Sequence, residues 1–232
     1  MDTSHQKIAI WCGVFFVLCF GVGLTAVAPM VPPISPSSSA EQVSEFFIAN
    51  DWRIKFGCWI TMMGASFQIP LWIVLAYQMS RMEKGLPLLG FTQAASGSFN
   101  CAYFILGPVI WVTIAFRNEL SPELALVFND FGWILYLFIT SPQIVQNLSI
   151  AAATLSNKTG KQVLPRWFGF LNIWVALGVM PAGFIQFFRT GPFAWDGIIS
   201  FWLVIASFTV WITSVLIVLN KAVNEEMQNG GS

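Results

Sequence analysis

Long apolar runs, separated by short polar segments, occupy most of the chain. Six of these runs contain no charged residue: residues 8–40, 56–80, 85–116, 131–157, 167–188 and 197–220. A helix that crosses a bilayer needs about 20 mostly apolar residues, and each run provides them. The runs are continuous rather than alternating over about ten residues at a time, which favours helices over a β-barrel. We therefore predict an all-α integral membrane protein, a bundle of six transmembrane helices.

Capping residues set limits to several of these helices. Ser121 can cap the fourth helix, because Pro122 then takes its first position and Glu123 complements the helix dipole. Ser39 with Gln42 matches a capping box, which predicts a short amphipathic outer helix over residues 40–50, between spans one and two. This helix either rests on the outer bilayer surface or forms a lid over a cavity. We expect a single domain over residues 1–232, with spans at about 8–28, 54–80, 87–116, 126–156, 167–188 and 197–220.

The two ends of the chain allow alternative interpretations. Residues 8–28 follow Lys7 and end in a small-residue pattern, as a signal peptide would. This run has 21 residues, however, which exceeds the roughly 7–15 apolar residues of a signal peptide. Pro29 should also disfavour cleavage after Ala28. We expect a retained first span, and we interpret residues 230–232 as a possible linker scar.

Basic residues in the loops predict the orientation. With both termini in the cytoplasm, the cytoplasmic side holds seven of them: Lys7, Arg81, Lys84, Lys158, Lys161, Arg166 and Lys221. The opposite side holds four: Arg53, Lys55, Arg117 and Arg189. This layout is typical of small bacterial inner-membrane proteins, so we predict a multi-pass protein of a cell membrane.

Composition narrows the chemistry of the protein. Hydrophobic residues make up 56% of the chain and charged residues 9%, against about 25% charged residues in soluble domains. The net charge is zero and no basic tract occurs, so we expect no nucleic acid partner. The only histidine, His5, lies in the N-terminal tail, and the four cysteines form no C-x-x-C pair. We therefore expect no metal, no cofactor and no catalytic residue.

Neutral polar residues inside the spans are the candidate functional residues. In the fourth span they follow steps of three and four residues, which places them along one helix face. Asp130, near the predicted outer end of the fourth span, is the only candidate for a carboxylate at depth. It is either an interfacial carboxylate, paired with Arg117 or hydrated, or a gate or ligand contact at the outer mouth. The candidate ligand-binding residues are Gln68, Gln93, Asn100, Asp130, Trp133, Tyr136, Gln143, Asn147 and Asn172.

These residues have two interpretations. Amides in hydrocarbon need partners, so the stripes either join helices to one another or line a polar pocket. Prolines interrupt four of the spans, and the carbonyls they free could bind a ligand. They are Pro70, Pro108, Pro142 and Pro181.

Three classes of function remain open. The first is binding or passage of a neutral or lipophilic small molecule through the bundle. The second is an accessory or assembly subunit of a larger membrane complex, with a membrane protein partner or a second copy. The third, a membrane-embedded enzyme, is the least supported, because metal ligands and general bases are missing. Lipid is the one partner that all three classes share.

Overall fold

The computed structural model describes residues 2–138 and 140–230, and within these residues it is helical, with no strand. Six helical segments are long and apolar enough to cross a membrane. They are Thr3–Val27, Asp51–Ser80, Leu88–Phe116, Pro122–Ser156, Arg166–Phe187 and Ile198–Gln228. The predicted six-helix membrane bundle is thus confirmed. The last helix is longer than predicted, and residues 231 and 232 of the suspected linker lie outside the described part.

Every span changes its helical geometry along its length. The second to fifth spans do so near their middle: α3 (Asp51–Ala65) passes into α4 (Gln68–Ser80), α5 (Leu88–Phe99) into α6 (Cys101–Phe116), α7 (Pro122–Phe138) into α8 (Ser141–Ser156), and α9 (Arg166–Val179) into the 3₁₀ helix η2 (Met180–Phe187). The first span is α1 (Thr3–Gly21) followed by the π-helix η1 (Val22–Val27), and the sixth is the π-helix η3 (Ile198–Leu203) followed by α10 (Val204–Gly230).

Proline explains three of the changes. Its ring clashes with the carbonyl four residues earlier and removes one helical hydrogen bond. Pro70, Pro142 and Pro181 lie within a few residues after the breaks in the second, fourth and fifth spans. Pro108 lies inside α6 without ending it. The third span breaks instead at Asn100, whose side chain bonds to another span.

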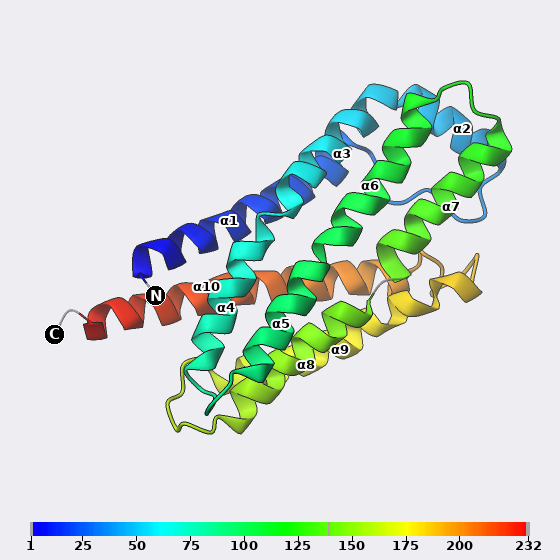
Figure 1. Cartoon of the computed structure of the whole chain (residues 1–232). Helices are drawn as coiled ribbons and strands as arrows, with labels where there is room; N and C mark the ends of the chain where they lie inside the picture. Colours follow the sequence, from blue (N-terminus) through cyan, green and yellow to red (C-terminus); the bar gives the residue numbers. More distant parts are fainter. Residues whose placement is uncertain (1, 139, 231–232) are drawn as a thin grey trace.

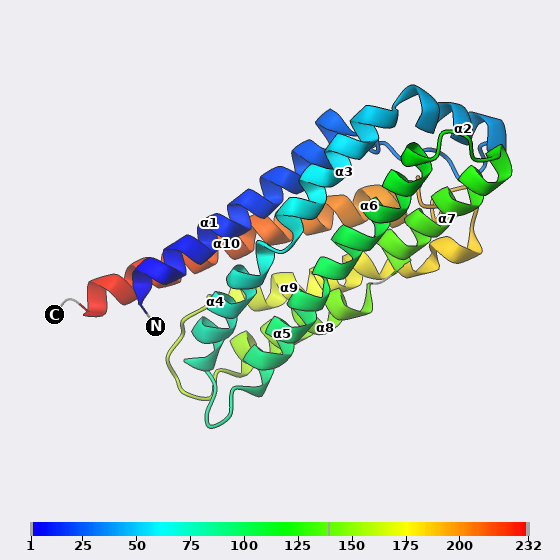
Figure 2. The same ribbon diagram turned by 45° about the horizontal axis from the view of Figure 1, so that its top comes forward.

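The six spans form a ring in chain order. Each span packs against the next one, and α10 closes the ring by packing against α1 (Figures 1 and 2). Both termini lie at one end of the bundle, which we call the termini end, and α2 (Ala40–Ala49) lies at the other, which we call the α2 end. A ring of helices leaves an interior that side chains from all spans must fill.

The helix α2 covers its end of the bundle. Its capping box is complete: the backbone N–H of Gln42 donates to Ser39 Oγ at 3.3 Å, and the Ser39 N–H donates to Gln42 Oε1 at 2.9 Å. Val43 and Phe47 are fully buried and belong to a core cluster shared with α6 and α7. The apolar face of α2 therefore packs against the bundle, which favours a cover over a helix resting on lipid.

Apolar side chains fill the ring in two main clusters. The cluster in the termini half contains Trp72 and Trp211, whose rings stack with centroids 5.4 Å apart. The cluster in the α2 half contains Trp111 and Trp133, with centroids 4.7 Å apart. The level between these clusters is the level at which the spans change geometry, and it holds the candidate site.

A polar cluster holds the termini end together. The Glu226 carboxylate of α10 accepts hydrogen bonds from Gln78 Nε2 and Tyr77 OH of α4, both at 2.9 Å, and from Gln6 Nε2 of α1 at 3.3 Å. Arg81 pairs with it at 3.0 Å. Because these residues come from the first, second and last spans, the cluster joins both ends of the chain to the second span.

Candidate functional site

A cavity of about 80 Å³ lies inside the ring, near mid-bundle. Its walls come from five of the six spans. Several lining residues mark the points where helices change: Val179 ends α9, Val204 begins α10, and Thr140 directly precedes α8. The lining residues are Phe20, Tyr103, Phe104, Tyr136, Leu137, Thr140, Gln143, Val179, Val204, Ile205 and Phe208. Interrupted helices cannot pack along their whole length, which explains why space remains at this level.

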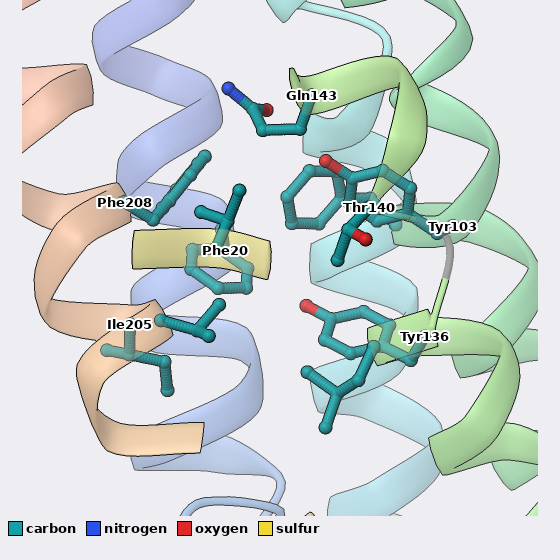
Figure 3. A pocket seen from close by; sticks show the side chains of 11 residues that line it. Phe20, Tyr103, Tyr136, Thr140, Gln143, Ile205 and Phe208 are labelled. Atoms are coloured by element: carbon teal, nitrogen blue, oxygen red, sulfur yellow. The ribbon is translucent and has the colours of Figure 1, made fainter. Parts of the chain in front are cut away.

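The cavity has a mixed wall and an apolar wall. All four polar lining residues, Tyr103, Tyr136, Thr140 and Gln143, come from the third and fourth spans. The facing residues from the first, fifth and sixth spans are apolar. Figure 3 shows the hydroxyl groups of Tyr103 and Tyr136 directed toward the space that faces Phe20 and Ile205. No lining residue carries a charge, so the cavity favours an uncharged occupant.

Tyr136 brings a buried, unpartnered hydroxyl to this wall. Its hydroxyl oxygen is buried and has no hydrogen-bond partner. Its ring packs between the cavity and the α2-half cluster, with its centroid 5.3 Å from that of Trp111 and 6.0 Å from that of Phe104. Gly107 allows this position, because a Cβ there would lie 2.8 Å from the Tyr136 ring. An unpartnered buried hydroxyl costs about 1–3 kcal/mol unless something binds it.

The other amides predicted for the site mostly bond to one another. Asn100 Nδ2 donates to Gln143 Oε1 and to Gln146 Oε1, both at 3.0 Å, and Gln143 Nε2 donates to Asn147 Oδ1 at 3.0 Å. Gln146 Nε2 donates in turn to Gln93 Oε1 at 3.4 Å. This network joins the third span to the fourth, as expected for amides that hold helices together.

The network also reaches the second span. Gln93 Nε2 donates to the backbone carbonyl of Trp72 at 2.7 Å, and the Trp72 indole donates to Gln68 Oε1 at 3.1 Å. Gly97 makes room for this arrangement, because a Cβ there would lie 2.3 Å from Gln146 Nε2. The amide network thus joins three consecutive spans just on the termini side of the cavity.

Asn172 serves a separate junction between the last two spans. Its Nδ2 donates to the Phe168 carbonyl at 2.7 Å within α9, and its Oδ1 accepts from the Trp211 indole at 2.9 Å. Neither contact leads into the cavity. This asparagine orients one of the two tryptophans that stack in the termini half.

The predicted site residues therefore fall into distinct groups. Tyr136 and Gln143 line the cavity, and Gln143 belongs to the network as well. Gln93, Asn100 and Asn172 bond to neighbouring spans, whereas the bonds of Gln68 and Asn147 lie within their own spans. Trp133 and Asp130 lie farther along α7, toward the α2 end.

Asp130 lacks the ion pair considered for it. Arg117 Nη1 pairs with Glu119 Oε1 at 3.3 Å instead, two residues away on the same loop. Asp130 Oδ1 is buried without a hydrogen-bond partner. The expected pairing of Asp130 with Arg117 is therefore wrong, because the loop carboxylate is the nearer one.

Sequence reasoning missed most of the aromatic lining. Phe20, Tyr103 and Phe208 were not among the candidates, because a single aromatic residue in an apolar run looks like any packing residue. The signal that could have located them is positional: the prolines of several spans lie at one level of the bundle, and space is expected where helices are interrupted.

The described residues contain no group of three or more His, Cys, Asp or Glu side chains that could hold a metal ion. All four cysteines are free thiols, and Cys58 and Cys101 are buried. Comparison with protein families, with curated proteins and with solved structures found no match for this chain. What the fold defines is the class: a polytopic helical membrane protein with an internal cavity.

Proposed function

We propose that the protein binds a small neutral or lipophilic molecule in the mid-bundle cavity and passes it along the bundle. The observation that carries this proposal is the cavity itself, uncharged and apolar on one wall, with the unpartnered Tyr136 hydroxyl on the other. The amide network supports the proposal indirectly, because its hydrogen bonds join the third and fourth spans, which supply the polar wall of the cavity. A site built on rigid elements keeps its shape without a ligand.

The size of the cavity limits the ligand. A cavity of about 150 Å³ is needed to hold benzene, and drug-sized ligands occupy about 300–1,000 Å³. The cavity of this protein has about 80 Å³. A molecule of a few non-hydrogen atoms, or the end of a longer chain, therefore fits without rearrangement of the walls.

Xenon in pressurised crystals tests whether apolar matter enters the cavity. We expect an anomalous scattering peak among Phe20, Ile205 and Phe208 in the unmodified protein. Val204→Phe should abolish the peak, because it places a ring in the cavity wall. The matched control is Leu203→Phe, which adds the same ring one residue away at a side chain that is 45% exposed. A peak that persists in Val204→Phe, or no peak in any variant, would contradict the proposal.

We propose that the protein lies in a cell membrane, such as the inner membrane of a bacterium, with both termini in the cytoplasm. The support is the distribution of basic residues: seven lie toward the termini end and four toward the α2 end. Passage would then lead between the α2 end and the termini end. Each end is closed, one by α2 and the other by the cluster around Glu226.

A further inference from the structure

We propose that the ligand of the cavity carries an uncharged oxygen acceptor, such as a carbonyl group, and that the Tyr136 hydroxyl donates a hydrogen bond to it. This inference rests on the proposed function and names its substrate class. It starts from an imbalance between donors and acceptors in the α2 half of the bundle.

Buried polar atoms without partners gather on α6 and α7. Besides the Tyr136 hydroxyl they include the indole nitrogens of Trp111 and Trp133, both side-chain polar atoms of Asn129, and Oδ1 of Asp130, which lies nearer the α2 end. Asn129 and Trp111 are fully buried, and Trp133 is 1% exposed. Asn129, Trp133 and Tyr136 share one face of α7 at steps of four and three residues, so they form a row that ends at the cavity.

This row has more donors than acceptors. An indole nitrogen only donates, a tyrosine hydroxyl donates and accepts, and an asparagine amide has two N–H donors and one oxygen. The Trp111 nitrogen lies close to Gly132, where a Cβ would be 2.5 Å from it, and it has no hydrogen-bond partner. A phenol hydroxyl is a better hydrogen-bond donor than acceptor, which favours an acceptor oxygen over a second donor beside Tyr136.

Within the cavity, the Tyr136 hydroxyl is a buried group without a hydrogen-bond partner. The Gln143 amide is already committed, because its oxygen accepts from Asn100 and its nitrogen donates to Asn147. Water could bond only to the polar wall, because the facing wall is apolar and offers it no partner. A small carbonyl compound satisfies both walls: its oxygen meets Tyr136 and its hydrocarbon part meets Phe20 and Ile205 (Figure 3).

Acetone and isobutene form a probe pair that isolates the oxygen. They have nearly the same shape, but isobutene has a CH₂ group where acetone has its acceptor. Each is labelled with ¹³C at its central carbon and added to protein reconstituted in bilayers. Cross-polarised solid-state NMR detects only immobilised probe, because freely tumbling probe in water or lipid gives no signal.

We expect immobilised acetone in the unmodified protein, with its carbonyl resonance shifted downfield by the hydrogen bond. Tyr136→Phe should remove this shift and weaken acetone binding about three- to tenfold, the loss of one neutral hydrogen bond. The same variant should leave isobutene binding unchanged. Tyr77→Phe is the matched control, because it removes a hydroxyl at the termini end, where Tyr77 bonds Glu226; it should behave as the unmodified protein does.

Each other outcome overturns the inference in a recognisable way. If isobutene binds as tightly as acetone, or if Tyr136→Phe retains the shift, the cavity binds lipophilic molecules but the acceptor assignment is wrong. If neither probe is immobilised while xenon still enters the cavity, the acceptor assignment fails alone. If xenon is also excluded, the proposed function fails with it. Should Tyr136→Phe fold poorly, Val204→Phe provides the second test, because it should exclude both probes equally.

Discussion

Replacing Asn100 by alanine should loosen the contact between the third and fourth spans. Asn100 is 1% exposed and sits where α5 ends and α6 begins. Both of its N–H donors reach the fourth span, at Gln143 Oε1 and Gln146 Oε1, each at 3.0 Å. No other hydrogen bond from a described residue reaches either glutamine oxygen, so the substitution leaves two buried acceptors unpaired.

The expected loss of stability follows from these contacts. Hydrogen bonds between membrane helices contribute about 0.6 to 1.7 kcal/mol each, so two of them give about 1–3 kcal/mol. One effect opposes this loss: Asn100 Oδ1 is itself unpartnered, and alanine removes that buried oxygen. We therefore expect about 2 kcal/mol, which lowers the melting temperature by about 4–8 °C in a protein of this size.

The native cysteines provide the assay. In a background with the partly exposed Cys12 and Cys19 replaced by serine, the buried thiols of Cys58 and Cys101 react with a thiol-reactive fluorescent dye only as heating exposes them. Asn118→Ala, in an exposed loop, is the control for the same chemical change. If Asn100→Ala melts within about 1 °C of this control, the amide network does not hold the spans together, and the assignment of these amides to helix packing is refuted.

Three further predictions concern packing, the termini end and the orientation. Gly57→Ala should lower stability by about 1–3 kcal/mol or more, because its Cβ would lie 2.3 Å from the Gly23 carbonyl oxygen. Gly21→Ala, whose Cβ would have no neighbour within 4 Å, should be neutral in the same melting assay. Equal melting temperatures would contradict this close helix approach. Glu226→Ala should cost about 2–3 kcal/mol, since it removes the acceptor that Gln6, Gln78 and Arg81 share. Glu225→Ala, whose side chain is 52% exposed, should cost little. A neutral Glu226→Ala would show that the cluster does not hold the termini end together. A fluorescent-protein fusion at the C-terminus should fluoresce in cells and a periplasmic reporter fused there should stay inactive, and the opposite result would reverse the proposed orientation.

For the proposed passage, contacts at each end of the bundle must break. At the α2 end, the buried face of α2 must leave the bundle before a molecule can reach the row on α7. At the termini end, the hydrogen bonds to Glu226 join α1, α4 and α10. Opening at either end therefore has an identifiable set of contacts to break, and the cavity lies between the two sets.

The hydrophobic pattern alone determined the class of fold. Charge-free runs of sufficient length specify spanning helices, because hydrocarbon offers the backbone no other partner than itself. The sequence also predicted the helix caps: the Ser39 and Gln42 capping box and the Ser121 N-cap are both present in the structure. These features depend on residues close together in the chain, so no tertiary information was needed.

The tertiary structure alone decided what the polar residues do. The helical stripes place Asn100, Gln143 and Tyr136 on interior faces, but a stripe does not reveal the distance to the neighbouring helix. Asn100 and Gln143 hydrogen-bond to each other across the third and fourth spans. The Tyr136 hydroxyl has no partner and lies at a cavity where the helices are interrupted. Whether a buried polar group bonds to another helix or faces a cavity depends on contacts between residues far apart in the chain. Packing around the whole ring of spans sets these contacts.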